Sequence, residues 1–427
     1  MSAWSLRFTM WYMAVLLTQP QNRFLFLYPF HIADIAVMGA LGFHVLACGQ
    51  GEAQLLRMGR ATVLCLTVLI LATISNYTGP LQAVYGWNPY MDILFKNALV
   101  LLLVEAACTS IARVWMVQAT LAICTLWWIK GGLRLAAAGA THAGDRLMGP
   151  GVSLVENPNG FAYMLCVMIP IYFYFFQQSK EKWLKYAWLF VAIASIFIVL
   201  KTGSRTGMLC LIGCAAFVIP KYLMKYKMVL GISATSLFLL WGSIGESNIE
   251  RFKSIPQSFM HFFMGSADEK RPEEMGQDEQ SAWERRMKNK HTKELIMMYP
   301  LFGSGMYTND KLIPSHLGQA AGQVHCEILM AGKQMGIPGM LVYIGMIYVM
   351  LGFGWKVEKH CKGWWPEVSD LGWTIKVQGV IFAIGGSFSP LPFNIVMLVV
   401  VACGSSLWRL VQELPVPAAD GRSAVAA

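Results

Sequence analysis

The sequence predicts an all-α protein that crosses a membrane many times. Of its 427 residues, 56% are hydrophobic and 14% are charged. Soluble domains carry about 25% charged residues, so this deficit indicates lipid as the solvent. About twelve apolar segments approach the roughly 20 residues that a membrane-spanning helix needs. Because the bilayer core offers no water to backbone N–H and C=O groups, these segments are predicted to be helices.

The predicted helices form an N-terminal group in residues 1–244 and a C-terminal group in residues 324–414. The first segment contains Arg7 and is the least regular. No small-residue cleavage site follows it, so we expect it to remain in the protein and not to be removed as a signal peptide. The segments lie at about 3–18, 29–48, 61–77, 92–107, 112–129, 160–177, 183–200, 206–222, 228–244, 337–355, 372–390 and 392–410.

Three polar stretches interrupt the apolar pattern. Residues 245–323 form a large loop with a solvated tip at Asp268–Glu274. Within this loop Ala282–Met298 is basic and amphipathic, which predicts a helix lying on the membrane surface. Residues 130–158 are rich in Gly and Ala and are predicted to form a second, partly helical loop. The tail 415–427 is predicted to be disordered.

The net charge of +10 is distributed as a membrane-topology signal and does not indicate a nucleic-acid surface. The large loop is near neutral, with ten Lys and Arg against eleven Asp and Glu. Much of the surplus lies in short loops, which the positive-inside rule assigns to the cytoplasm. The large loop, the 130–158 loop and Arg205 are then outside, with both termini inside. The lysines of these short loops form three clusters, which are Lys180, Lys182 and Lys185; Lys221, Lys225 and Lys227; and Lys356, Lys359 and Lys362.

Motifs of several common enzyme classes are missing from the sequence. It contains no Walker loop and no Asp-x-Asp pair, which disfavours nucleotide hydrolysis and metal-dependent sugar-nucleotide transfer. Cys210 and Cys214 stand one helical turn apart, but no histidine or second pair accompanies them, so neither a metal site nor a cofactor is predicted. Few acidic residues lie within apolar segments (Asp34, Asp92 and Glu105), which weakens a proton-coupled transporter hypothesis.

Arg205 is the strongest candidate for a binding residue. It stands between Gly203 and Gly207, where one apolar segment ends and the next begins. A guanidinium presents a planar fork of donors to phosphate, glycines allow close backbone approach, and the following helix offers free N–H groups. The alternative is an interfacial arginine that reaches only for lipid headgroups. Asn157 and Asn159 lie in a predicted turn whose amides are suited to holding a sugar or phosphate.

Further candidates lie in and after the large loop. His325 ends it and can take a proton near neutral pH, although a lone histidine is more often structural. Glu327 either orients His325 or caps a helix. Arg285, with Arg286 beside it, belongs to the amphipathic stretch, where a basic face that binds anionic membrane lipids is the simpler interpretation.

Four short segments occur in a distinctive order. Each is weak alone, but with the large loop they resemble the O-antigen ligase and polymerase superfamily of bacterial polytopic membrane glycosyltransferases, over roughly residues 150–410. The segments are Asn157-Pro-Asn159-Gly-Phe-Ala162; Gly203-Ser204-Arg205-Thr-Gly207; Ser281-Ala-Trp-Glu-Arg285 continued by Pro300-Leu-Phe-Gly303-Ser-Gly305; and His325-Cys-Glu-Ile-Leu329 followed by Gly336-Ile-Pro-Gly339.

The resemblance implies a GT-C-like fold of about twelve helices, with a site between the bundle and a periplasmic loop at the bacterial inner membrane. It implies a glycan donor carried on undecaprenyl diphosphate and a sugar hydroxyl acceptor, such as lipid A–core in lipopolysaccharide biosynthesis. The transfer would be inverting and independent of metal, because two guanidiniums can hold the departing diphosphate. Arg205 and Arg285 would bind the diphosphate and His325 would be the base. Other substrate-binding residues would be Asn157, Asn159, Ser204, Arg286 and Glu327.

One position departs from the family pattern. The family usually has Asn after its His, whereas this chain has Cys326, a poorer hydrogen-bonding group, so the acceptor is open. An O-antigen or exopolysaccharide polymerase with the same donor chemistry is the nearest alternative. A protein O-glycosylation ligase is disfavoured because no extra acceptor-binding domain is visible. From another class, a transporter or flippase of lipid-linked glycan predicts inverted repeats and broken helices, and neither is clear in the sequence.

Overall fold

The computed structural model describes residues 1–22, 24–142, 146–151, 153–223, 245–253, 277–320 and 322–414, and the single residues 227, 231, 235 and 238. Within these ranges the chain is built from helices, and its strands are one short antiparallel pair, β1 (Thr141–His142) and β2 (Arg146–Leu147). The prediction of an all-α polytopic membrane protein is confirmed. The predicted helix 228–244, the loop tip Asp268–Glu274 and the tail 415–427 lie outside the described residues, apart from 231, 235 and 238.

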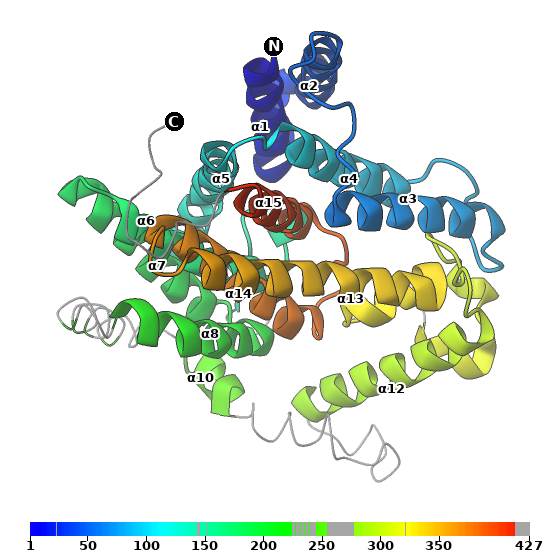
Figure 1. Cartoon of the computed structure of the whole chain (residues 1–427). Helices are drawn as coiled ribbons and strands as arrows, with labels where there is room; N and C mark the ends of the chain where they lie inside the picture. The colour runs from blue at the N-terminus through cyan, green and yellow to red at the C-terminus, as the bar shows by residue number, and fades with distance from the viewer. Residues whose placement is uncertain are drawn as a thin grey trace.

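Figure 1 shows α13 crossing the bundle, with α1 and α2 paired at one end and α12 along the lower edge. The α-helices are α1 (Ser2–Thr18), α2 (Ile32–Gly49), α3 (Arg60–Thr78), α4 (Pro89–Ala107), α5 (Ile111–Ala137), α6 (Pro158–Gln178), α7 (Lys182–Lys201), α8 (Arg205–Val218), α10 (Glu246–Lys253), α12 (Gln277–Met298), α13 (Glu327–Cys361), α14 (Pro366–Gly386) and α15 (Ile395–Gln412). Short 3-10 turns are η1 (Pro20–Asn22), η2 (Leu25–Phe30), η3 (Ser153–Val155), η6 (Asp310–Leu312) and η7 (Ser315–Ala320), and η4 (Ile219–Leu223) is a π-helix.

Seven helical stretches in the described ranges are long and apolar enough to cross a membrane. Eleven of the twelve predicted segments fall on helices. Four of those helices, α1, α4, α8 and α14, are not among the seven that are long and apolar enough to cross a membrane. Twelve spans therefore remain a prediction. The seven stretches are Leu25–Gly49, Arg60–Thr78, Ile111–Ala137, Pro158–Gln178, Lys182–Lys201, Glu327–Cys361 and Ile395–Gln412.

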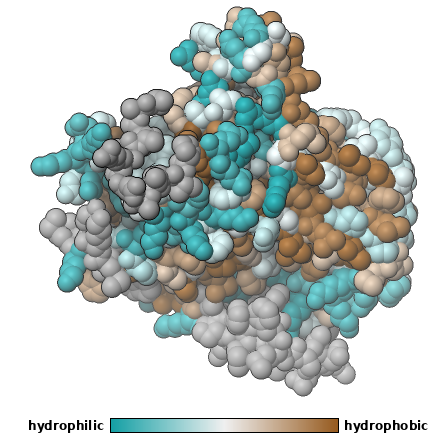
Figure 2. Space-filling view, viewed as in Figure 1, coloured by the Kyte–Doolittle hydropathy of each residue, from teal (hydrophilic) through white to brown (hydrophobic). Residues whose placement is uncertain are grey.

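Two of these spans form the centre of the bundle. The apolar windows of α6 and α15 are 94% and 83% buried, whereas those of α3, α7 and α13 are 44% buried or less. A helix that is apolar all round is buried among others, and one with a single exposed apolar side borders lipid. Figure 2 shows the apolar surface gathered on the right half of the face, where Figure 1 places α3 and one end of α13.

Two helices start earlier than their apolar segments. α14 begins at Pro366 and not at 372, because proline suits the first helical position. α13 begins at Glu327 and not at 337, but its helical geometry breaks at Gly336, whose φ is 71° and ψ is −166°. This conformation is open almost only to glycine. The predicted segment 337–355 therefore corresponds to the part of α13 that follows the break.

The break in α13 receives the end of the large loop. Helix ends leave backbone carbonyls without helical partners. The carbonyl of Lys333 accepts hydrogen bonds from the backbone N–H of Ser304 at 2.8 Å and from its hydroxyl at 2.9 Å. The backbone N–H of Ile337 donates to the carbonyl of Pro300 at 2.8 Å. The Pro300–Gly305 segment is thus part of the packing of the membrane bundle and not a free loop.

We predict that Gly336→Ala destabilises the protein by about 2 kcal/mol or more, because the backbone conformation is strained for alanine. A Cβ at this position would also stand against the Pro300 carbonyl. The measurement is thermal unfolding of the purified protein in detergent. Gly42→Ala in α2 is the control, since nothing lies within 4 Å of its added Cβ. Equal melting temperatures for the two variants would show that the break tolerates a side chain.

Candidate functional site

The turn between α7 and α8 presents Arg205 as the first residue of α8. Ser204 caps this helix, and its fully buried hydroxyl accepts a hydrogen bond from the N–H of Gly207 at 3.1 Å. Gly203 turns the chain with φ of 57°, in the left-handed region. The Arg205 side chain is half-buried. Its backbone position is therefore fixed by the cap and the turn on either side.

The two glycines around Arg205 have a packing role that the sequence did not predict. A Cβ on Gly203 would collide with the Asn248 side chain of α10, and a Cβ on Gly207 would collide with Ala162 of α6. Both glycines therefore face protein, where they allow α10 and α6 to pack closely. The expectation that they also bring the backbone up to a ligand remains a prediction.

A hydrogen-bond network joins this turn to the start of α6. The Oδ1 of Asn159 accepts from the hydroxyl of Ser204 at 2.9 Å and from Nη2 of Arg146 at 2.7 Å. The Nε of Arg146 donates to the carbonyl of Thr202 at 3.1 Å. Asn157 caps α6, accepting from the N–H of Gly160 at 2.7 Å. Asn159 and Ser204 thus hold the turn that carries Arg205, and Asn157 holds the start of α6. Contact of these three residues with substrate remains a prediction.

Arg146 was missed as a site residue by the sequence interpretation. It comes from β2, within the 130–158 loop that was expected to be a partly helical flap, and α5 does extend into that loop as far as Ala137. The only sequence signal was an arginine in a Gly- and Ala-rich loop. A charged hydrogen bond contributes about 1.5–3 kcal/mol, so Arg146 is a strong tie between β2, α6 and the α7–α8 turn.

The second part of the site lies between α12 and the start of α13. Two apolar residues near the end of α12 pack against protein on either flank, and the position of this helix at the membrane surface remains a prediction. Leu295 lies in one small apolar cluster and Ile296 in another. The first cluster contains Leu81, Leu295, Ile313, Leu317 and Ala320, and the second contains Ile296, Val324, Leu329 and Met330. Val324 is fully buried and holds the adjacent His325 in place.

His325 lies among positive charges. Burial, together with the smaller effects of the nearby positive charges of Arg285 and Lys288, lowers the pKa of His325 from 6.5 to about 4. These two residues are three apart on α12, so they share a helix face. Arg286 is not among the groups that act on His325, which favours Arg285 over its neighbour. The imidazole is neutral at pH 7 and is able to accept a proton.

Lys333 also belongs to this region and was not predicted. It is 3% exposed, and its Nζ donates to the carbonyls of Ala320 at 2.7 Å and Gly322 at 3.0 Å. It therefore holds the segment that leads into His325. Lys288 and Asp310 both act on it electrostatically. The predicted segment 337–355 did not include Lys333, so the cost of a charge within a membrane-spanning helix became apparent only once α13 was seen to begin at Glu327.

Glu327 points into the bundle. It is fully buried, accepts a hydrogen bond from the hydroxyl of Tyr343, and lies against Gly386 of α14. The second carboxylate oxygen makes no hydrogen bond, although Ser389 and the backbone of Leu391 lie near the group. His325 is not among these groups around the Glu327 carboxylate. Substrate binding by Glu327 remains a prediction.

The Arg205 turn and His325 lie at the same end of the bundle. Glu327, two residues after His325, acts electrostatically on Tyr163 of α6 and Cys210 of α8. Tyr163 is one turn beyond Asn159, and Cys210 is five residues beyond Arg205. Figure 1 shows α8, α10 and α12 along the same edge of the molecule. Within the described residues, no group of three His, Cys, Asp or Glu side chains is placed to hold a metal ion.

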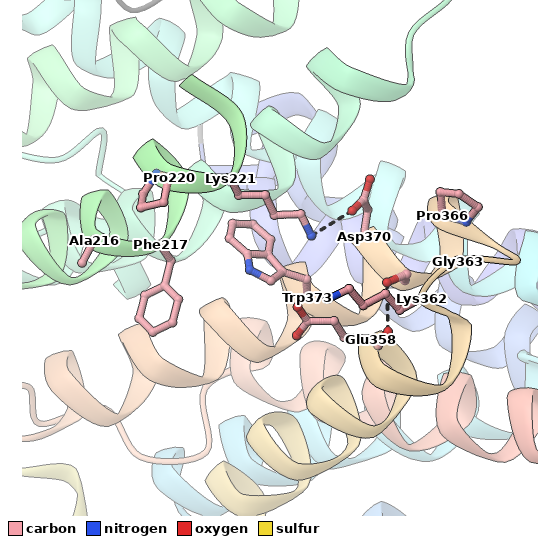
Figure 3. Close-up of a pocket in the computed structure, with 11 residues that line it drawn as sticks. Ala216, Phe217, Pro220, Lys221, Glu358, Lys362, Gly363, Pro366, Asp370 and Trp373 are labelled. Carbon is pink, nitrogen blue, oxygen red and sulfur yellow. Dashed lines mark hydrogen bonds and ion pairs between the residues drawn. The ribbon is translucent and has the colours of Figure 1, made fainter. Parts of the chain in front are cut away.

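A separate cavity of about 550 Å³ lies at the opposite end of α8 (Figure 3). Lys221 of η4 forms a 2.8 Å ion pair with Asp370 of α14 and lies over the ring of Trp373, 4.3 Å from its centroid. Gln177 donates to the same carboxylate at 3.0 Å. Because α8 is about 20 Å long, this cavity is not part of the Arg205 site. Its walls include Lys221 and Lys362, so two of the three predicted cytoplasmic lysine clusters meet here.

Comparison with known proteins identifies one domain. Residues 189–344 match the family model described as O-antigen ligase. No curated protein matches the chain. The matched segment contains Arg205, Arg285 and His325, and it is narrower than the 150–410 expected from the motifs, so it excludes Asn157 and Asn159. The predicted resemblance is confirmed.

Cys326 stands at the N-cap of α13 with φ of −157° and makes no side-chain cap. Asn is among the best N-cap residues, so the Asn usual in the family suits a capping role here. We predict that Cys326→Asn stabilises the protein by about 1 kcal/mol, measured by thermal unfolding in detergent. Cys326→Ala is the control and should give no gain. Unchanged stability of Cys326→Asn would argue against a capping role for this position.

Proposed function

Because residues 189–344 carry a domain of the O-antigen ligase superfamily, we propose that the protein is a membrane glycosyltransferase of the ligase type. It transfers a glycan from undecaprenyl diphosphate to a sugar hydroxyl of lipid A–core. The reaction is inverting, needs no metal and takes place at the periplasmic face of the bacterial inner membrane. The observation that carries the proposal is the half-buried His325, close enough to Arg285 and Lys288 for their charges to act on it, at the same end of the bundle as Arg205.

In the proposed reaction His325 takes the proton of the acceptor hydroxyl. The acceptor oxygen forms a bond to the anomeric carbon of the donor while the bond from that carbon to the diphosphate oxygen breaks. The bonding electrons leave with undecaprenyl diphosphate, whose added negative charge is stabilised by Arg205 and Arg285. Fixed guanidiniums do this well because they need no reorientation as the charge develops.

The nearest alternative is a polymerase, in which a second lipid-linked glycan supplies the hydroxyl. The two are separated by supplying purified protein in nanodiscs with an undecaprenyl-diphosphate oligosaccharide, with or without lipid A–core, and measuring product masses. Product that requires lipid A–core supports the ligase. Lipid-linked glycan that lengthens without it supports the polymerase. Absence of both products from folded protein with native substrates would favour another acceptor, or a transporter of lipid-linked glycan.

We predict that Arg205→Ala lowers the transfer rate by about 10²–10³-fold, the usual effect of removing one donor to a developing negative charge. Arg205→Lys should recover part of the loss, because lysine keeps the charge but not the planar fork. Lys362→Ala, which removes the same charge at the opposite end of α8, is the control and should act like the parent. Near-normal product from well-expressed Arg205→Ala would rule out its proposed role.

We predict a pH profile of kcat/KM that is flat near neutrality and falls in acid as His325 becomes protonated, with its midpoint near the pKa of about 4. Lys288→Gln should move this midpoint towards 6.5, since one of the two positive charges that disfavour the imidazolium is removed. Lys290→Gln, an exposed neighbour on α12, is the matched control. An acid limb that does not move in Lys288→Gln would contradict the assignment of His325 as the base.

A further inference from the structure

The turn Met297–Phe302, at the end of α12, exposes apolar side chains although it belongs to the large polar loop. The exposed fractions are 70% for Met297, 66% for Leu301 and 40% for Phe302. By contrast, the two residues of α12 that precede this turn, Leu295 and Ile296, are buried against protein. Exposed apolar groups clustered in one turn need a covering partner, because scattered single residues are normal but contiguous patches mark interaction sites.

This turn is continuous with the lipid-facing side of α13. Ile337 donates its backbone N–H to Pro300 within the turn. From Ile337, exposed apolar residues recur at Leu341, Ile344 and Tyr348, which is one face of a helix. α13 is one of the helices able to cross a membrane, and this face is not covered by the described part of the chain. The same lipid that covers the α13 face therefore extends to the turn.

The depth of the turn follows from the length of α13. Trp355 is 51% exposed and is followed by Lys356, Lys359 and Lys362, a sequence typical of a membrane–water boundary. Ile337 lies 18 residues before Trp355, or about 27 Å along the helix. The hydrocarbon core is about 30 Å thick, so Ile337 and the attached turn lie near its opposite boundary.

Aromatic side chains of the α3–α4 connection lie at the same membrane depth as the Met297–Phe302 turn. Leu81 and Ala83 donate backbone hydrogen bonds to the carbonyls of Ser304 at 3.0 Å and Tyr307 at 2.7 Å, so this connection is bound to the loop end. Tyr85 and Trp87 from it are 60% and 64% exposed. Exposed Tyr and Trp are characteristic of the headgroup level of a bilayer.

We propose that the Met297–Phe302 turn inserts into the bilayer leaflet on the Arg205 side and anchors α12 at the level of the phospholipid headgroups. The partner is bilayer phospholipid, whose acyl chains cover Leu301 and Phe302. The insertion does not depend on the proposed function. One consequence of the insertion does depend on the proposed function. Arg285 and Lys288, on the same helix, would be held near the plane in which a lipid-linked diphosphate lies.

The test is fluorescence quenching in phosphatidylethanolamine–phosphatidylglycerol nanodiscs. A small fluorescent amino acid is incorporated at position 301, with position 341 on the α13 face as the lipid control and position 290 on exposed α12 as the water control. Lipid spin-labelled near the headgroup should quench the probe at 301 several-fold more than iodide does, as at 341. Position 290 should show the reverse order.

Quenching at 301 that follows the iodide pattern of 290 would overturn the proposal, since the turn would then lie in water. A double variant, Leu301→Glu with Phe302→Glu, tests whether these two side chains hold the turn in the membrane. In this variant a probe at position 298 should lose its quenching by spin-labelled lipid. Both side chains are exposed, so the fold should survive, and an unchanged probe at 341 would confirm it. Persistent lipid quenching at 298 would show that these side chains do not hold the turn in the membrane.

Discussion

The break in α13 at Gly336 is the constraint on which the rest of the site depends. It ends the first part of the helix inside the protein and leaves carbonyls that no helical N–H can reach. The loop end supplies the missing donors through Ser304, and Ser75 of α3 donates its hydroxyl to the carbonyl of Gln334. A conformation open almost only to glycine therefore lets a long extramembrane loop become an integral part of the bundle.

This docking also explains why flexible-looking segments can hold charged groups in fixed positions. α12 is held by two apolar clusters, and the segment before His325 is held by the Nζ of Lys333. Arg205 is held by capping, by a left-handed turn and by Arg146. Preorganisation of this kind matters for stabilising a departing anion, because donors that are already aligned need not reorganise during the reaction.

The sequence predicted most helices because the bilayer leaves few alternatives for an apolar segment. It also predicted the family resemblance, which the match over residues 189–344 confirms, whereas the roles of Arg205, Arg285 and His325 remain predictions. It failed where a residue's role depends on its neighbour in space. Gly203 and Gly207 pack against protein, a fact that only the positions of Asn248 and Ala162 reveal. Arg146 acts through Asn159, thirteen residues away, and no local pattern encodes that pairing.

The charges around His325 imply an order for the proposed reaction. Burial is the first cause of its low pKa, and Arg285 and Lys288 are the others. With no anion present the imidazole is neutral but holds a proton weakly. A diphosphate bound by Arg285 would offset those positive charges and raise the pKa back towards 6.5, because an opposite charge nearby favours the protonated form. The base would then be strongest only when the donor is in place, so acceptor activation is linked to donor binding by electrostatics alone.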